Sequence, residues 1–264
     1  MSDTLLRVKG VNKRFGGLQA LSEVGVEIAR GQIYGLIGPN GAGKTTFFNV
    51  ITGLYQPDSG TFELDGKPYS PSEPHKVAHA GIARTFQNIR LFPEMTALEN
   101  VMVGRHVRTR ATFFGAVLRT RGERAEEAAI KKRSLELLDY VGIRRYADFQ
   151  ARTLAYGDQR RLEIARALAT DPKLLALDEP AAGMNATEKV ALRGLLSNIR
   201  NDGATILLIE HDVKLVMGLC DRVTVLDYGK TIAEGAPADV QRNAAVIEAY
   251  LGGAHTPAAG QEAA

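Results

Sequence analysis

The chain has 264 residues, enough to bury a full hydrophobic core, and its formal net charge of +3 is too small to indicate a nucleic-acid partner. A single cysteine, Cys220, excludes a disulfide framework and is typical of a reducing compartment. The longest apolar runs, residues 174–177 and 206–209, fall far short of the ~20 residues that cross a bilayer, and residues 2–4 do not begin a signal peptide, so we expect a cytoplasmic protein.

Strands are predicted for the N-terminal part of the chain. Residues 5–11 and 24–28 contain clustered or alternating apolar side chains, and residues 60–66 are typical of a strand that closes on an Asp-Gly turn. Another short apolar strand, at residues 33–37, leads into a glycine-rich loop. A helix is expected after the loop, over residues 45–54.

The glycine-rich loop matches the pattern Gly-x-x-x-x-Gly-Lys-Ser/Thr. Its glycines let successive backbone N–H groups point into one concavity, and the following helix adds the positive end of its dipole. The Lys44 ammonium would reach the outer phosphates of a nucleotide, and the Thr45 hydroxyl can bind Mg²⁺. A glycine-rich turn with a surface lysine is the alternative, but the strand–loop–helix context favours a nucleoside triphosphate site. The predicted loop consists of Gly38, Pro39, Asn40, Gly41, Ala42, Gly43, Lys44, Thr45 and Thr46.

The rest of the chain alternates between helical and strand-like segments. Apolar residues recur at helical spacing over residues 125–141 and again over 158–169. Strands at 174–178, 205–210 and 223–226 then enclose a helix at 187–200, and a turn follows at 227–230. Strands that alternate with helices predict an α/β fold with a mostly parallel sheet, interrupted here by a helical insert. We expect residues 252–264, which are small and polar, to be disordered.

Charged side chains follow two of the predicted buried strands. Asp178 and Glu179 come directly after residues 174–177, and Glu210 and His211 follow 205–209. Ligands of parallel sheets lie beyond the carboxyl ends of the strands, where the phosphate loop also begins. Asp178 is suited to Mg²⁺, Glu179 to orienting or deprotonating an attacking water, and His211 to a hydrogen bond with a γ-phosphate. The three strand ends predict a magnesium-dependent triphosphatase site.

A further motif gives a family resemblance. The residues Leu154, Ala155, Tyr156, Gly157 and Asp158, followed by Gln-Arg-Arg, resemble the signature motif of ABC-type ATPases. With the phosphate loop, residues 174–179 and His211 in the expected order, the resemblance spans about residues 5–251. It implies a P-loop core with an antiparallel β subdomain at residues 1–87 and 155–251, and a helical subdomain at 88–154.

The resemblance also implies roles for individual residues. Phe15 matches the aromatic residue that stacks on adenine, and Gln87 matches the glutamine that connects the nucleotide site to the transmembrane partner. Without the resemblance, Phe15 would be interpreted as a core aromatic and Gln87 as a loop residue. The implied catalytic residues are Lys44, Gln87, Glu179 and His211. The implied magnesium ligands are Thr45, Gln87 and Asp178. Residues 154–158 would cap the ATP held by a second subunit.

This chain departs from the usual motif Leu-Ser-Gly-Gly-Gln. Ala155 replaces a serine, Tyr156 a glycine and Asp158 the polar fifth residue, although Asp158 could cap its own helix. Asn185 stands where aspartate is common. Because these changes weaken the face that activates the opposite site, they favour pairing with a distinct homologous subunit over pairing with a second copy.

A closer resemblance points to the ATPase subunits of importers of branched-chain and related hydrophobic amino acids. It rests on residues 155–157, 159–166, 178–183, 209–212, 214–217 and 249–252, and on an arginine-rich insert at 104–124. The insert would contact anionic headgroups or the permease, or else form a solvated helix face. Residues 88–93 are predicted to dock the coupling helix of the permease because their apolar side chains need a partner.

We therefore expect an ATPase, dependent on ATP and Mg²⁺, that lies peripherally on the cytoplasmic face of the inner membrane. Its expected partners are a second ATPase subunit, two permease subunits and, indirectly, an external solute-binding protein, with no nucleic acid. The alternatives are the ATPase of a lipid or lipopolysaccharide exporter and a soluble ABC protein. A P-loop kinase or GTPase would leave residues 154–158 unexplained, and residues 12–15 fail the guanine-reading pattern Asn-Lys-x-Asp.

Overall fold

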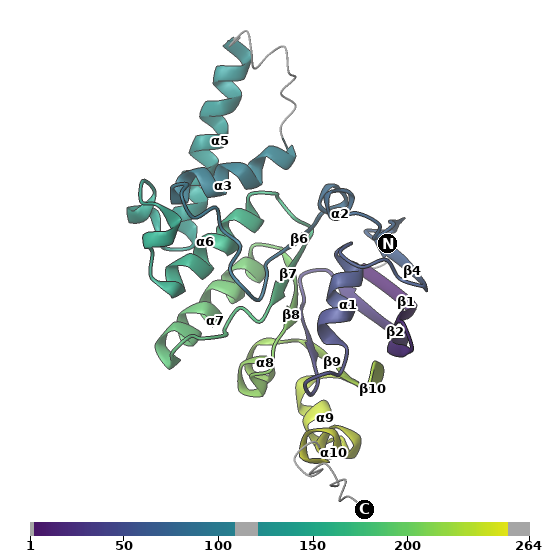
Figure 1. Ribbon diagram of the computed structural model, residues 1–264. Helices are drawn as coiled ribbons and strands as arrows, with labels where there is room; N and C mark the ends of the chain where they lie inside the picture. Colours follow the sequence, from purple (N-terminus) through teal and green to yellow (C-terminus); the bar gives the residue numbers. More distant parts are fainter. Residues whose placement is uncertain (1–2, 109–120, 253–264) are drawn as a thin grey trace, which may run out of the picture.

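The computed structural model describes residues 3–108 and 121–252, which form two sheets and a group of helices (Figure 1). The strands are β1 (Thr4–Phe15), β2 (Leu18–Ala29), β3 (Ile33–Ile37), β4 (Ser59–Leu64), β5 (Lys67–Pro68), β6 (Ile82–Arg84), β7 (Leu174–Asp178), β8 (Thr205–Ile209), β9 (Arg222–Asp227) and β10 (Lys230–Gly235). The helices are α1 (Lys44–Ile51), α2 (Pro74–Ala80), α3 (Ala97–Arg105), α5 (Arg121–Tyr140), α6 (Tyr156–Leu168), α7 (Ala186–Asn201), α8 (Val213–Leu219), α9 (Pro237–Arg242) and α10 (Ala244–Gly252). In the described part of the chain, no helix is long and apolar enough to cross a membrane.

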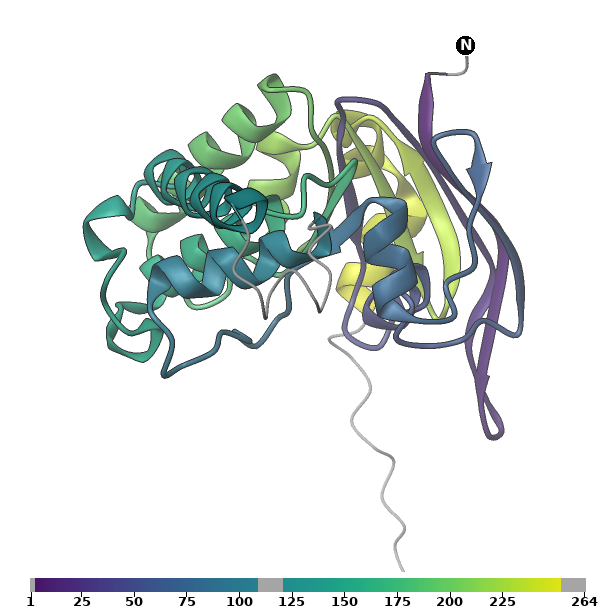
Figure 2. The same cartoon turned by 90° about the horizontal axis from the view of Figure 1, so that it is seen from above.

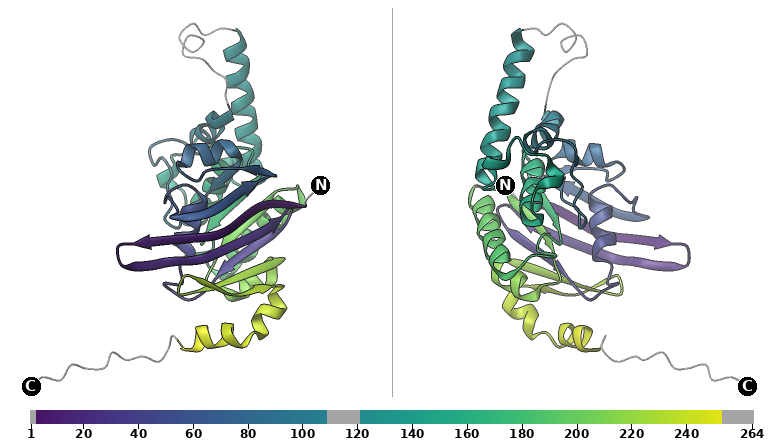
Figure 3. Two further views of the ribbon diagram at one scale, coloured as in Figure 1. Left: turned by 90° about the vertical axis from the view of Figure 1, so that its right-hand side faces the viewer. Right: turned by 60° about the vertical axis from the view of Figure 1, so that its left-hand side comes forward.

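The smaller sheet is antiparallel, with strand order β2-β1-β4-β5. The predictions of strands at residues 5–11 and 24–28 were correct in kind but too short, because β1 and β2 pair from Thr4 and Ala29 as far as Phe15 and Leu18. The extension has one fully buried side chain, Leu21, so its apolar pattern is weak, and backbone hydrogen bonding continues the pair. Figure 3 shows this long hairpin projecting from the body of the molecule.

The larger sheet has the order β10-β9-β3-β8-β7-β6, and only β10 runs antiparallel to its neighbour. The predicted α/β class with a mostly parallel sheet is confirmed. Strands β6 and β10 were not predicted. In β6 three residues are too few for a pattern, and β10 has no fully buried residue.

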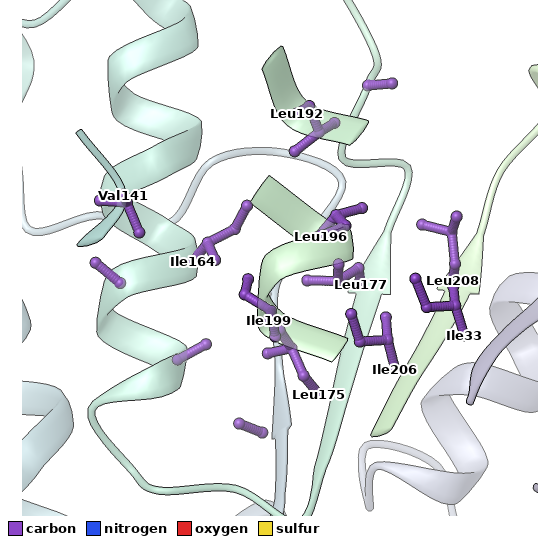
Figure 4. Packing of buried hydrophobic residues seen from close by; sticks show 14 of the residues in the cluster. Ile33, Val141, Ile164, Leu175, Leu177, Leu192, Leu196, Ile199, Ile206 and Leu208 are labelled. Carbon is purple, nitrogen blue, oxygen red and sulfur yellow. The ribbon is translucent and has the colours of Figure 1, made fainter. Parts of the chain in front are cut away.

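Alternate residues of the central strands face two separate cores. Leu174 and Ala176 of β7 pack with α1 and the antiparallel sheet, whereas Leu175 and Leu177 pack with α6, α7 and α8. Figure 4 shows the second core, in which Ile164, Leu196 and Ile199 lie against β7 and β8. Because both faces of these strands are covered, they contain continuous apolar runs, as the sequence indicated.

The helices α3, α5 and α6 lie together at the end of the molecule away from the antiparallel sheet (Figure 2). Gly104 allows α3 to approach α6, since a Cβ there would lie 2.3 Å from the carbonyl oxygen of Arg166. Helix α5 confirms the helix predicted at 125–141 and begins earlier. Most of the arginine-rich insert predicted at 104–124 lies outside the described residues.

Several predicted boundaries shift by a few residues. The helix expected to reach residue 54 ends at Ile51, because the Thr52 hydroxyl donates to the carbonyl of Phe48 and Gly53 turns the chain at φ +78°. The tail predicted as disordered at residues 252–264 lies outside the described residues except for Gly252, which ends α10.

Candidate functional site

The loop of residues 38–46 joins β3 to α1 and depends on glycine at two points. Gly38 has φ +151°, and a Cβ there would lie 2.1 Å from the carbonyl oxygen of Leu226. Gly43 has φ +97°, and its Cβ would lie 2.8 Å from the carbonyl oxygen of Ala20. Helix α1 starts at Lys44, so its unpaired N–H groups end at this loop. The arrangement is that of an anion-binding helix terminus.

The Lys44 side chain is buried under the loop, with 7% of its surface exposed. Its ammonium donates to the carbonyl oxygens of Gly38 at 2.7 Å and Pro39 at 2.9 Å. Burial lowers the pKa of Lys44, and the carboxylates of Glu179 and Asp178 oppose this shift. A buried cation without an anion in direct contact is costly, so the loop is suited to receiving negative charge.

A cavity of about 450 Å³ lies over the loop, large enough for a small ligand. Its lining residues are Phe15, Leu18, Gln19, Ala20, Asn40, Gly41, Ala42, Gly43, Lys44, Thr45, Thr46, Gln87, Glu179, Tyr228 and Gly229. The interpretation of Phe15 as a core aromatic is wrong, because the ring is 42% exposed at the end of β1. It contacts Tyr55 edge to face at 5.3 Å between centroids. The cavity therefore combines an aromatic face with an anion-binding loop.

Glu179 lies at the end of β7, where the chain turns away from the sheet. Its N–H donates to the carbonyl of Ile209 at 2.9 Å, and its backbone adopts φ +46°. Gln87 donates from Nε2 to Glu179 Oε2 at 2.9 Å, and His211 Nδ1 lies 3.5 Å from the same oxygen. His211 is largely exposed and does not line the cavity. The structure thus brings two predicted site residues, Gln87 and His211, to the carboxylate of a third, Glu179.

Asp178 is buried and does not line the cavity. Its Oδ2 lies 3.4 Å from Nη2 of Arg84. Burial raises the pKa of Asp178, and the Arg84 guanidinium opposes this rise. The described residues contain no group of three His, Cys, Asp or Glu side chains placed to hold a metal ion. Hydroxyl, amide and carboxylate oxygens such as those of Thr45, Gln87 and Asp178 are of the kind that Mg²⁺ binds in proteins, so the chemistry of these side chains fits the ion.

Residues 154–158 lie on a different surface and line none of that cavity. Ala155 is the N-cap of α6 and provides no side-chain cap. The expectation that Asp158 caps the helix is wrong, because Asp158 lies inside the first turn of α6. There its carboxylate faces the positive end of the helix dipole. Leu154 is buried, whereas Tyr156 is 45% exposed.

Asn185, the other departure from the usual motif, caps α7. Its Oδ1 accepts from the N–H of Glu188 at 3.0 Å, and Oε2 of Glu188 accepts from the N–H of Asn185 at 2.9 Å. Asparagine and aspartate are about equally good N-caps. The asparagine therefore keeps this helix terminus intact.

Tyr228 and Arg84 are among the residues near the site that were not predicted from the sequence. Tyr228 lines the cavity from the β9–β10 turn and is 86% exposed, with φ +42°. The turn was predicted, but its place over the phosphate loop follows only from the pairing of β9 with β3. Arg84 contacts Asp178 and also donates to Asn49 at 2.9 Å and Thr52 at 2.7 Å. Arg84 was not recognised as a site residue because it is the last residue of β6, a strand that was not predicted.

Comparisons with known proteins match nearly the whole chain. A family model described as ABC transporter matches residues 21–182, and one described as branched-chain amino acid ATP-binding cassette transporter matches 230–256. The chain is 45% identical over 253 residues to the high-affinity branched-chain amino acid transport ATP-binding protein BraF of Pseudomonas aeruginosa, covering 96% of this chain and 99% of BraF. Its identity to LivG of Escherichia coli, a protein of the same description, is 46% with the same coverage.

Solved structures agree with these sequence matches. The ADP conformation of MJ1267, an ATP-binding cassette of an ABC transporter, superposes with a TM-score of 0.82 at 31% identity, over 95% of this chain and all of that one. A dimeric post-hydrolysis structure of the cassette MJ0796 bound to ADP and Pi gives 0.74 at 27% identity, over 88% and 99%.

Proposed function

Since the chain belongs to the ABC transporter family of ATP-binding proteins, we propose that it energises the uptake of branched-chain or related hydrophobic amino acids. The observation that carries this proposal is the 45–46% identity to BraF and LivG over almost the full length of all three chains. A second support is the family model that matches residues 230–256, outside the ATPase motifs. These relatives favour an importer over a lipid exporter or a soluble ABC protein.

The proposed reaction is ATP hydrolysis at the cavity over the phosphate loop. The N–H groups of the loop and the Lys44 ammonium bind the phosphates, and Glu179 takes a proton from the attacking water. Gln87 and His211, which both approach the Glu179 carboxylate, orient that water and the γ-phosphate. Magnesium, when bound, supplies positive charge beside the outer phosphates, and Thr45, Gln87 and Asp178 would hold it.

Phe15 is proposed to stack on the adenine ring. Replacing Phe15 with alanine should raise the Kd for ATP by about 5- to 100-fold, since stacking of an aromatic side chain on a base contributes about 1–3 kcal/mol. The turnover number at saturating ATP should change little, because the contacts that hold Glu179 are made by Gln87, His211 and the Ile209 carbonyl and not by Phe15. Titration with a fluorescent ATP analogue measures the change, and Phe149→Ala, at another exposed aromatic residue, is the control. An unchanged Kd would remove Phe15 from the site.

Residues 154–158 are proposed to contact ATP held by a second subunit. They lie on a surface separate from the chain's own cavity, and the related cassette MJ0796 is a dimer. Gly157 and the N-terminus of α6 offer N–H groups to that phosphate. The departures at Ala155, Tyr156 and Asp158 support a distinct homologous partner rather than a second copy.

Two permease subunits are the proposed membrane partners. A groove of about 320 Å³ lies between α2, α3, α6 and the segment after β6. Phe92 lines it with its ring 43% exposed, and the guanidinium of Arg166 lies 5.8 Å from the ring centroid. A cytoplasmic helix of a permease would cover this apolar surface.

We propose residues 88–154 as a helical subdomain that faces the permease, and residues 1–87 and 155–251 as the ATP-binding core.

Transport by the assembled complex tests the proposed function. The tagged full chain should co-purify from its native membranes with two permease subunits. Placed in liposomes with ATP on the side of this chain and a solute-binding protein outside, the complex should accumulate labelled leucine, isoleucine or valine only when ATP is hydrolysed. Hydrolysis stimulated by lipid without amino-acid uptake would support the exporter alternative, and hydrolysis indifferent to any membrane partner would support the soluble one.

A further inference from the structure

A buried ion pair in α6 has no part in the reaction described above. Arg160 and Glu163 are 2% and 1% exposed, and Nη1 of Arg160 lies 3.2 Å from Oε2 of Glu163. Burial raises the pKa of Glu163, and the Arg160 guanidinium and two backbone N–H groups oppose that rise. Charged side chains are rarely buried this deeply unless they hold specific partners.

Both side chains of the pair bind the backbone of the segment that carries Gln87. Arg160 donates from Nη1 to the carbonyl of Phe86 at 2.6 Å and from Nη2 to the carbonyl of Gln87. Glu163 accepts through Oε1 from the N–H groups of Phe86 at 3.3 Å and Arg90 at 3.4 Å. Helix α6 therefore fixes the backbone on both sides of the Gln87 side chain.

Arg160 also contacts Tyr156 at the start of α6. Nη2 of Arg160 donates to the Tyr156 hydroxyl at 3.0 Å, and the guanidinium lies 5.4 Å from the ring centroid. The same ring covers Gly183, where a Cβ would lie 3.2 Å from Cε1 of Tyr156. Tyr156 is thus held against the loop after β7 and against Arg160, although nearly half of it is exposed.

These contacts form one continuous path between two surfaces. It runs from the exposed Tyr156 through Arg160 to the backbone of Gln87, and from the Gln87 side chain to Glu179 at 2.9 Å. A planar guanidinium with acceptors on two sides permits few alternative geometries, so a displaced Tyr156 would displace Gln87 or break a bond. Packed hydrogen-bonded elements of this kind can carry coupling between sites.

We propose that Arg160 is a positioning residue that couples the surface of residues 154–158 to Gln87 and Glu179. Binding of the second subunit's ATP at this surface would then set the position of the glutamine beside the chain's own catalytic carboxylate. The inference rests on the proposed function, because it assumes that this surface contacts a second nucleotide. Tyr156, a departure from the usual motif, supplies the aromatic hydroxyl at which the path begins.

The test compares steady-state hydrolysis by the full chain carrying Arg160→Lys or Tyr156→Phe. Lysine keeps the charge but cannot hold two carbonyls and a hydroxyl in one plane, so the turnover number should fall about tenfold. Tyr156→Phe removes one acceptor at a half-exposed position and should lower it about threefold. The Kd for ATP should stay within about twofold in the Arg160→Lys variant, since no residue of the cavity changes and Arg160 is not among residues 154–158. Arg193→Lys is the matched control, because Arg193 also donates to a backbone carbonyl, that of Gly218, but on α7.

A double-mutant cycle separates positioning from general support of the fold. In a Gln87→Ala background, Arg160→Lys should lower turnover by less than about twofold further, because its effect acts through Gln87. A full tenfold further loss in that background, or an unchanged turnover number in both single variants, would overturn the proposal. If the Arg160→Lys variant does not fold, Tyr156→Phe replaces it in the cycle, and its effect on turnover should likewise be smaller in the Gln87→Ala background. Absence of ATPase activity from the parent chain even in the presence of its homologous partner subunit and the permease would instead contradict the proposed function.

Discussion

Replacement of Glu179 by glutamine is expected to abolish most ATP hydrolysis, by about 10²- to 10⁴-fold, while ATP still binds. The amide has nearly the size of the carboxylate and can still accept the hydrogen bond that Gln87 donates. It cannot accept a proton from water, however, and phosphate binding needs no general base. The complex of two subunits closed over ATP would therefore accumulate.

Size-exclusion chromatography of the Glu179→Gln chain with ATP and Mg²⁺ measures that accumulation. We expect a dimer that dissociates when EDTA removes the metal, either from the chain alone or with its homologous partner subunit. Glu94→Gln is the control, because Glu94 is an exposed carboxylate paired with Arg152 on another surface. A monomer that continued to hydrolyse ATP at the parent rate would contradict the assignment of Glu179.

The central strands β3, β7 and β8 could be predicted because their apolar runs are continuous. Residues 174–177 and 206–209 are buried on both faces of the sheet. Consecutive residues of these strands are therefore all apolar, and the run can be recognised in the sequence. The hairpin of β1 and β2 was predicted too short because its outer half is held by backbone pairing rather than by burial. Apolar patterns in the sequence predict strands that are buried. They do not predict the part of a strand that is extended by backbone hydrogen bonds alone.

The candidate site likewise contains residues that could be predicted from the sequence and residues that could not. The phosphate loop is contiguous, so the sequence contains all of it, and the predicted juxtaposition of Glu179 and His211 follows from the rule that parallel strands end at one edge. Arg160 was not predicted to lie near the site, because an arginine on an amphipathic helix usually reaches solvent. Its burial is caused by the segment after β6, which folds over α6 and brings its carbonyls there. No local pattern contains that contact.

The proposed role of the signature residues, 154–158, depends on a second subunit. In the structure they lie apart from the chain's own phosphate loop, and the cassette MJ0796 forms a dimer. If they contact a second subunit's ATP as proposed, their departures from the usual motif would affect the opposite nucleotide rather than their own. Asn185 keeps the capping box of α7, so the loop between β7 and α7 retains its geometry despite the substitution.

Replacement of Lys44 by alanine is expected to weaken ATP binding by about 10- to 100-fold, because a charge-assisted hydrogen bond contributes about 1.5–3 kcal/mol. In the parent chain the ammonium is held by the carbonyls of Gly38 and Pro39, directly under the concavity of the loop. The variant loses this counter-charge and leaves two carbonyls without their donor. Loop N–H groups and the α1 terminus remain, so some phosphate affinity should persist.

Thermal unfolding with and without ATP distinguishes this loss from a loss of folding. Burial lowers the pKa of Lys44, which means that the free chain bears a cost for keeping it charged. Without nucleotide, relief of this cost and loss of the donor to two carbonyls act in opposite directions, so the alanine variant should unfold at a temperature close to that of the parent. At an ATP concentration about 100 times the parental Kd, the parent gains about 2.7 kcal/mol of stability, and the variant should lose at least half of that gain. Lys173→Ala, which removes a lysine paired with Asp65, is the control. Equal stabilisation of Lys44→Ala and parent by ATP would place the phosphates elsewhere, since no other described lysine lines the cavity.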